Sequence, residues 1–323
     1  MPKILHTARY TGTPWEILKS VVPDGFKVET LEELSYDSLL RQCTDADYLL
    51  VSGRLPIDEG VLSAAKHLKM IQRTGVGTEM LDLEAIKRHN IPVYVNKGVN
   101  ARSVAEHTLT LMLACLKRLP PINADTHNGV WKKQQQGLTT HELYGKTVAL
   151  VGMGNIGRTV AAMLQPFGVR ILYTDVYRQS ADVENNLGLN YCESFESMLP
   201  DADILSFHCP LTIENTEMLN KETLIMMKEG AIVVNTARGK LINPNDLYNA
   251  ICDAKISAAG LDTHYEEPLK EGYKLARLSN VILTPHIGGL SFEAFRTMMA
   301  DAVANIILFE KGNVESIKDK LLQ

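Results

Sequence analysis

The chain has 323 residues, of which 45% are hydrophobic and 22% are charged, and its formal net charge is −5. This is the composition of a globular protein with enough length for two domains. The net negative charge argues against nucleic acid as a partner, and no apolar run approaches the length that spans a membrane. The five cysteines are scattered without a Cys-x-x-Cys pair, which argues against a disulfide framework or a cysteine zinc site. We therefore expect a cytoplasmic protein with no metal site, no nucleic acid partner and no membrane contact.

Short apolar runs alternate with helical patterns over the first hundred residues. Strands are expected at 4–7, 48–51, 69–71 and 92–94, and helices at 14–20, 35–42, 58–65 and 82–88. This alternation predicts a parallel sheet covered on both faces. A long periodic stretch then predicts a connecting helix over 101–118, ended by Pro120 and Pro121. The polar residues 122–141 are expected to form a surface loop.

Residues 145–175 carry the most informative motif of the chain. An apolar strand is expected at 148–151, and Gly152, Gly154 and Gly157 follow it with the spacing G-x-G-x-x-G. The first glycine would make a tight turn, the second would admit a pyrophosphate, and the third would allow close packing of helix and strand. A helix is expected to begin at Asn155, and its first amides, including that of Ile156, would face the phosphate charge.

A carboxylate completes the motif. The next expected strand, 170–174, ends at Asp175, whose side chain can accept hydrogen bonds from ribose hydroxyls and would repel a 2′-phosphate. With strand, helix, second strand and acid all in place, the stretch predicts a dinucleotide site that prefers NAD. Arg178 lies three residues further on and weakens the argument against NADP. The alternative is a glycine-rich turn in another kind of βαβ unit.

The second half of the chain predicts another sheet. Its strands are expected at 148–151, 170–174, 203–207, 231–234, 256–260 and 281–283, which is about the number that a dinucleotide-binding sheet uses. A helical pattern over 292–309 follows after that sheet is complete. We expect this helix to return to the first domain, which would make that domain discontinuous.

Three polar residues follow the last three expected strands. Arg238, Glu267 and His286 stand where open α/β sheets build their sites. An arginine can bind a carboxylate through two parallel hydrogen bonds, and a histidine can transfer a proton near neutral pH. A glutamate on the other ring nitrogen would fix the tautomer and stabilise the charged ring. Together they suit the reduction of a 2-keto acid.

Each of these residues also has a structural alternative. Arg238 would serve equally well to neutralise a helix end. Glu267 belongs to an acidic pair before a proline and would suit solvated surface, and His286 would suit a loop. The functional interpretation depends on all three occurring beside a nucleotide-binding fold.

The chain resembles the NAD-dependent D-isomer-specific 2-hydroxyacid dehydrogenases, the family of D-lactate dehydrogenases, glyoxylate or hydroxypyruvate reductases and phosphoglycerate dehydrogenases. The resemblance rests on residues 152–175, on the blocks 229–242 and 260–268, and on Pro285-His286-Ile287-Gly288. It implies an α/β protein of two domains. A Rossmann-type dinucleotide-binding domain at 100–287 would be inserted in a flavodoxin-like substrate domain formed by 1–99 and 288–323.

The resemblance also implies roles for individual residues. Arg238, Glu267 and His286 would be the catalytic set, with Arg238 on the substrate carboxylate. The further substrate-binding residues would be Arg54, Val76 and Gly77. Besides the glycine motif and Asp175, the residues expected at the cofactor are His208, Cys209, Pro210, Thr216, Thr236, Ala237 and Asp262. Asp262 has an alternative as a strand-end acid that caps a turn, and His264 is expected in the core or at the rim of the site.

The expected activity is hydride transfer between NADH and a 2-keto acid to give the D-2-hydroxy acid. Family resemblance also implies a homodimer formed through the dinucleotide-binding domain. A rival of another class is an NADH-sensing transcriptional corepressor of the C-terminal-binding-protein type, which shares this fold and can keep the triad. A formate dehydrogenase of the same fold is disfavoured, because that group has glutamine where Glu267 stands. The substrate side chain stays open.

Overall fold

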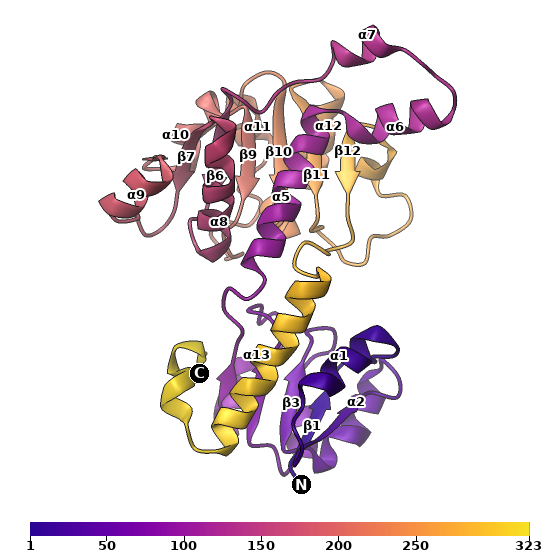
Figure 1. Ribbon diagram of the computed structural model, residues 1–323, viewed down its shortest axis with the longest axis vertical. Helices are drawn as coiled ribbons and strands as arrows, with labels where there is room; N and C mark the ends of the chain where they lie inside the picture. Colours follow the sequence, from indigo (N-terminus) through magenta and orange to yellow (C-terminus); the bar gives the residue numbers. More distant parts are fainter. Residues whose placement is uncertain (323) are drawn as a thin grey trace. The chain divides into compact units, whose positions relative to one another are not determined.

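The computed structural model describes residues 1–322, which form two compact units (Figure 1). The central unit is Ala101–Ser291. The terminal unit combines Met1–Asn100 with the segment that begins at Phe292. Each unit is an α/β sandwich in which helices cover both faces of a parallel sheet, so the α/β class with two domains is confirmed.

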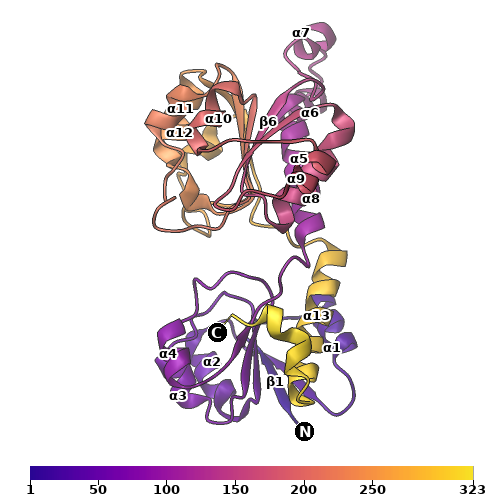
Figure 2. The same ribbon diagram turned by 90° about the vertical axis from the view of Figure 1, so that its left-hand side faces the viewer.

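The terminal unit has a sheet of five parallel strands in the order β2-β1-β3-β4-β5. The strands are β1 (Lys3–His6), β2 (Lys27–Thr30), β3 (Tyr48–Val51), β4 (Met70–Arg73) and β5 (Val93–Tyr94). One face carries α2 (Tyr36–Gln42), α3 (Glu59–Ala64) and α4 (Leu83–Arg88), and the other carries α1 (Thr13–Val21) and α13 (Phe292–Glu310) (Figure 2). This is the flavodoxin-like strand order, and α13 supplies the C-terminal contribution that the sequence predicts.

The central unit has seven parallel strands in the order β12-β11-β10-β9-β6-β7-β8. The strands are β6 (Thr147–Val151), β7 (Arg170–Thr174), β8 (Leu189–Tyr191), β9 (Ile204–Phe207), β10 (Ala231–Asn235), β11 (Ile256–Leu261) and β12 (Val281–Leu283). From β8 to β11 this is the order of a Rossmann sheet, with its switch point between β6 and β9. Ligands bind such sheets at the carboxyl ends of the strands.

Helices cover both faces of this sheet (Figure 2). One face carries α5 (Ala101–Leu116), α8 (Asn155–Leu164) and α9 (Ala181–Leu187), and the other carries α10 (Phe195–Met198), α11 (Lys221–Met226) and α12 (Pro244–Cys252). Short 3-10 turns lie at Cys43–Asp45, Gln165–Phe167, Leu199–Asp201, Gly239–Leu241, Lys274–Arg277 and Val314–Lys320. Leu111 and Met112 of α5 pack with Val160 of α8 in the core, and burial of such a side chain contributes about 1.5–3 kcal/mol.

Three elements differ from the sequence-based expectation. The strands β2 and β8 were not predicted from the sequence, because both lie at sheet edges, where strands are often short and polar and show no apolar run. The stretch expected to be a loop contains α6 (Leu119–His127) and α7 (Lys133–Gly137). Pro120 and Pro121 do not end a helix there but lie in the first turn of α6, where a proline fits because its nitrogen needs no acceptor.

Within residues 1–322, no helix combines the length and the apolar character needed to cross a membrane. The same residues contain no group of three or more histidine, cysteine or acidic side chains arranged to hold a metal ion.

Candidate active site

The glycine motif lies at the switch point of the central sheet. Gly152 has φ of +95°, and a Cβ atom there would lie 2.7 Å from the amide nitrogen of Cys209. A Cβ atom on Gly157 would lie 2.2 Å from the carbonyl oxygen of Gly152. A Cβ atom on Gly154 would meet nothing within 4 Å. The first and third glycines are therefore required by the packing of the protein itself, whereas the second leaves open space at the start of α8.

That open space has the polarity of an anion site. Helix α8 begins after Gly154 with no side-chain cap, and the amides of its first turn, at Asn155, Ile156 and Gly157, have no acceptor within the helix. Helix N-termini of this kind bind phosphate through free amides and the helix dipole. The residues thus fit the pyrophosphate of a dinucleotide.

Asp175 is held in place by the motif itself. Its Oδ2 accepts a hydrogen bond from the amide of Met153 at 2.5 Å, and its Oδ1 accepts one from the amide of Tyr177 at 3.1 Å. The carboxylate at the end of β7 therefore stands beside the glycine turn, where a ribose would lie next to the pyrophosphate.

Arg178 faces away from this carboxylate. Its Nε and Nη2 donate to the two oxygens of Glu184 at 2.9 and 3.0 Å, and its guanidinium lies 5.0 Å from the ring centre of Tyr191. Hydrogen bonds from Arg178, and then from Tyr173, lower the pKa of Glu184 to about 2. Arg178 is thus engaged within the protein, which strengthens the expectation of NAD over NADP.

The segment after β9 forms the other side of the switch point. The backbone of His208 and Cys209 touches Gly152. Burial lowers the pKa of His208 to about 3, and its Nε2 lies 3.0 Å from Ser206 Oγ, so the ring is neutral near the phosphate position. The other two predicted residues of this segment, Pro210 and Thr216, are exposed.

The catalytic candidates follow three neighbouring strands. Arg238 follows β10, Glu267 follows β11 and His286 follows β12, and these strands pair side by side. Because parallel strands end at the same edge of a sheet, the three loops meet. His286 Nδ1 lies 2.7 Å from Glu267 Oε2, and the other oxygen of Glu267 accepts a hydrogen bond from the His264 amide at 2.9 Å.

The electrostatics of this pair suit proton transfer. The hydrogen bond to Glu267 raises the pKa of His286 above its ordinary value, against burial and against the charge of Arg238. Burial raises the pKa of Glu267, but hydrogen bonds from His286 and from the His264 amide outweigh it, so that the net pKa is below the usual range. Since Nδ1 donates to Glu267, we assign Nε2 as the nitrogen that exchanges a proton with a ligand.

The loop of Arg238 is fixed by close packing. The side chain of Asn235 donates to the Arg238 carbonyl at 2.8 Å and accepts from the Ala237 amide at 2.9 Å. A Cβ atom on Gly239 would lie 2.0 Å from the carbonyl carbon of His264, so this loop rests directly on the loop that leads to Glu267. Two further predicted cofactor residues lie here, and both are buried: Thr236 and Ala237.

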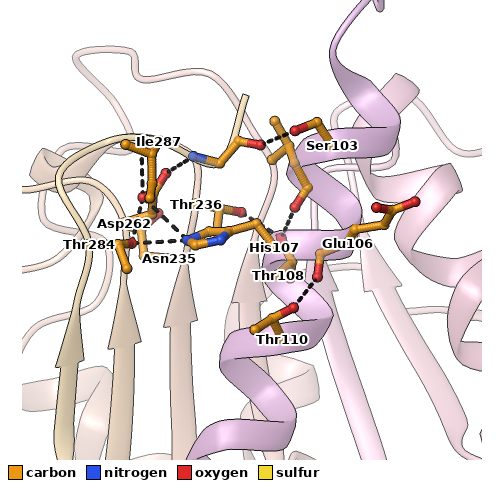
Figure 3. Close-up of polar contacts among 12 residues, drawn as sticks. Ser103, Glu106, His107, Thr108, Thr110, Asn235, Thr236, Asp262, Thr284 and Ile287 are labelled. Atoms are coloured by element: carbon orange, nitrogen blue, oxygen red, sulfur yellow. Dashed lines mark hydrogen bonds and ion pairs between the residues drawn. The ribbon is translucent and has the colours of Figure 1, made fainter. Parts of the chain in front are cut away.

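Asp262 lies at the centre of a buried network (Figure 3). Its Oδ1 accepts hydrogen bonds from Thr284 Oγ1 at 2.6 Å and from the Ile287 amide at 2.9 Å, and its Oδ2 accepts one from the Gly288 amide at 2.8 Å. Burial by itself would raise the pKa of Asp262. Hydrogen bonds from His107, from Thr284 and from the two amides outweigh this effect, so that the net pKa of Asp262 is lowered to about 2. The geometry supports the turn-capping alternative, and a contact with the nicotinamide stays a prediction.

His286 has a left-handed backbone with φ of +57°, a conformation that costs a residue with a side chain about 1–2 kcal/mol. Its amide donates to the carbonyls of Asp262 and Thr284 at 2.9 and 3.0 Å. The surrounding hydrogen bonds thus hold the turn that presents the imidazole.

Two further histidines belong to this network: His264, which the sequence places in the core or at the rim of the site, and His107, to which the sequence assigned no role. His264 is buried, and its Nε2 donates to the Thr284 carbonyl at 2.9 Å. His107 lies on α5 with Nε2 at 2.9 Å from Thr284 Oγ1. The only signal for His107 in the sequence is the polar pair of Glu106 and His107 within the largely apolar stretch 104–116.

The residues predicted at the substrate from the first domain lie on loops of the terminal unit. Val76 is 52% exposed and Arg54 is exposed. The buried Arg73 shapes this region, because its Nε donates to the Gly77 carbonyl at 2.6 Å and its Nη1 donates to the Val51 carbonyl at 3.0 Å. No sequence pattern marks Arg73, which lies just beyond the expected strand 69–71 and is the last residue of β4.

A Rossmann sheet with a glycine turn that fits a pyrophosphate, an acid at the end of β7 and a histidine–glutamate pair is typical of an NAD-dependent oxidoreductase. The family model for the D-isomer specific 2-hydroxyacid dehydrogenase, NAD binding domain, matches residues 109–288. The chain belongs to this family of NAD-dependent D-2-hydroxyacid dehydrogenases.

Individual relatives agree with this assignment. A hydroxypyruvate reductase of Thermotoga maritima is 36% identical over 279 residues, which cover 86% of this chain and 89% of that protein. A glyoxylate reductase of Thermococcus kodakarensis is also 36% identical, with 97% and 94% covered. The crystal structure of a D-lactate dehydrogenase from Aquifex aeolicus, complexed with NAD and lactic acid, has a TM-score of 0.84 at 27% identity and covers 99% of this chain and 98% of that one. These relatives favour the enzyme over the corepressor.

Proposed function

We propose that His286, Glu267 and Arg238 carry out the reduction of a short 2-keto acid to its D-2-hydroxy acid. The observation that supports this most strongly is the 2.7 Å contact between His286 Nδ1 and Glu267 Oε2, at the sheet edge where Arg238 also stands. When bound, NADH supplies the hydride, and the protein must supply a proton and hold the substrate.

Each residue has one task in this proposal. Arg238 binds the substrate carboxylate through its guanidinium, the group best suited to two parallel hydrogen bonds. His286, whose pKa is raised by its hydrogen bond to Glu267, donates the Nε2 proton to the carbonyl oxygen in its charged form. Glu267 holds Nδ1, which fixes the ring orientation and stabilises the charged form.

The cofactor residues are proposed in the same way. The amides of Asn155 and Ile156 would bind the pyrophosphate and Asp175 the adenosine ribose. The remaining proposed contacts are those predicted from the resemblance: His208, Cys209, Pro210, Thr216, Thr236, Ala237 and Asp262. In the terminal unit, Arg54, Val76 and Gly77 stay predicted substrate contacts.

The substrate class follows from the relatives. The relatives named above include a hydroxypyruvate reductase and a glyoxylate reductase, and hydroxypyruvate and glyoxylate are 2-oxo acids with a short polar side chain and with none; the structural neighbour is a D-lactate dehydrogenase, whose substrate is also short. We propose the same class for this chain. Comparison of glyoxylate, hydroxypyruvate, pyruvate and phenylpyruvate by NADH absorbance tests the proposal. The first two should give the highest kcat/KM, and preference for phenylpyruvate or no turnover with any of them would contradict it.

We also propose a homodimer formed through the dinucleotide-binding domain, in the cytoplasm. The segment of the central unit that includes α6 and α7 has three large exposed apolar side chains, Leu119, Trp131 and Leu138, which are 56%, 80% and 86% exposed. Exposed apolar side chains of this size are typical of protein interfaces.

A further inference from the structure

We infer that His107 is a positioning residue for His286, acting through Thr284 and Asp262. This inference rests on the proposed role of His286 as the proton donor. His107 belongs to α5 and lies outside the loops that carry the catalytic candidates.

The direction of each hydrogen bond can be assigned. Thr284 Oγ1 lies 2.6 Å from Asp262 Oδ1 and 2.9 Å from His107 Nε2. An ionised carboxylate only accepts, so the single hydroxyl proton of Thr284 goes to Asp262. The hydroxyl oxygen must then accept from His107 Nε2, which also lies 3.4 Å from Asp262 Oδ1. The result is a chain of donors that runs from His107 through Thr284 to Asp262 (Figure 3).

Asp262 in turn holds the backbone around His286 by accepting hydrogen bonds from three amides. The carbonyl of Asp262 accepts the His286 amide at 2.9 Å. The carboxylate of Asp262 accepts the next two amides, those of Ile287 and Gly288, at 2.9 and 2.8 Å. Three successive amides thus converge on one buried residue, and they define the left-handed turn at His286. A change in the position of Asp262 would move the imidazole.

Helix α5 contacts the loop of His286 at a second point, through a hydrogen bond from Ser103. Ser103 lies four residues before His107, on the same helical face, and its Oγ donates to the Gly288 carbonyl at 2.6 Å. The loop packs tightly against these side chains at Gly288, because a Cβ atom there would lie 2.9 Å from Asp262 Oδ2 and 3.3 Å from His107 Cδ2. The helix therefore serves as a rigid support for the loop of His286.

The side chain of His107 is only 19% exposed and that of Asp262 only 2%. Removal of the His107 donor would leave the lone pair of Thr284 Oγ1 without a donor at a poorly hydrated site, and would weaken the hydrogen bond from Thr284 to Asp262. A displacement of about 1 Å at a reacting group can cost on the order of 100-fold in rate. We expect the loss to appear in kcat, because neither NADH nor the substrate carboxylate touches His107 in this proposal.

A matched pair of variants tests the inference. His107→Leu removes the donor, and His107→Gln keeps an N–H donor near the Nε2 position. We expect kcat to fall about 10–100-fold in His107→Leu, with the substrate KM changed by less than about 3-fold, and His107→Gln to recover most of the loss. The alkaline limb of the pH profile of kcat should move to lower pH in His107→Leu, since a displaced imidazole loses part of its hydrogen bond to Glu267.

A second pair guards against a simple folding defect. Thr284→Val removes the hydroxyl at constant shape, and Thr284→Ser keeps it; thermal unfolding is measured for all four variants. Equal rates in His107→Leu and the unmodified enzyme, or equal losses in His107→Leu and His107→Gln, would overturn the inference. The variant His286→Ala distinguishes failure of the positioning role from failure of the proposed function. Full activity in His286→Ala would overturn the proposed function itself. An inactive His286→Ala together with a fully active His107→Leu would overturn the positioning role alone.

Discussion

Arg178 is bound to Glu184 by two parallel hydrogen bonds of 2.9 and 3.0 Å, and this pairing bears on the choice of cofactor. A free arginine three residues after Asp175 would be placed to meet a 2′-phosphate. The pairing keeps the guanidinium on Glu184 and over the ring of Tyr191. We therefore expect two side chains to disfavour NADP: Asp175, which would repel its 2′-phosphate, and Glu184, which holds Arg178 away from that phosphate.

The first prediction concerns this pair. The unmodified enzyme should prefer NADH by kcat/KM, and Asp175→Ser should reduce that preference because the repelling carboxylate is gone. Adding Glu184→Gln should release Arg178 and raise kcat/KM for NADPH by a further factor of about 5–10, the worth of one charge-assisted contact at an exposed site. Glu184→Gln alone is the control, and no gain for NADPH in the double variant would exclude a role for Glu184.

The second prediction concerns pH. Keto-acid reduction requires His286 in its charged form, so activity is present below the pKa of His286 and is lost as the pH rises through it. The hydrogen bond to Glu267 raises that pKa. In Glu267→Gln the pKa of His286 should therefore fall, and the alkaline limb of kcat/KM should move to lower pH. An unchanged limb would show that Glu267 does not act on the proton donor.

The third prediction separates two glycines of one motif. Gly154→Ala should fold normally, because a Cβ atom meets nothing within 4 Å there, but should weaken NADH binding by filling the space for the pyrophosphate. Gly157→Ala should destabilise the fold by about 1–3 kcal/mol, since its Cβ atom would lie 2.2 Å from the Gly152 carbonyl oxygen. Chemical denaturation and NADH fluorescence titration measure the two effects. Equal effects of the two variants on unfolding would contradict the packing argument.

The fourth prediction concerns assembly. Trp131→Ser combined with Leu138→Ser should shift the protein from dimer to monomer, because both side chains are more than three-quarters exposed in the single chain and would bury apolar area in a dimer. Size-exclusion chromatography with light scattering gives the mass directly, and a double substitution of two exposed lysines, Lys117 and Lys132, to serine is the control. A dimer that persists in the tryptophan–leucine variant would place the interface elsewhere.

Much of the fold could be predicted from local sequence. Strands such as Tyr48–Val51 and Thr147–Val151 are fully buried and therefore read as continuous apolar runs. The edge strand Lys27–Thr30 has a lysine and a glutamate among its four residues, so its strand character depends on pairing with β1, which no local pattern reveals. The helix that begins at Leu119 was misjudged because a pair of prolines fits both the end of one helix and the start of the next.

The same division holds for the candidate site. Arg238, Glu267 and His286 could be singled out because strand ends are where parallel sheets carry their chemistry. The side chains that surround the site could not be predicted in this way: His107 meets Thr284 across 177 residues of sequence, and the orientation of Arg178 is set by Glu184 and Tyr191 rather than by its position in the motif. Side chains that act through others are revealed by distances, which the sequence does not contain.

The most direct test of the account is single-turnover reduction of glyoxylate by His286→Ala with NADH already bound. Loss of a positioned proton donor costs about 100- to 10,000-fold in rate, while the NADH Kd, measured on the same sample by fluorescence, should stay within about 3-fold because no proposed cofactor contact is removed. A rate within about 3-fold of the unmodified enzyme would contradict the assignment of His286 as the proton donor.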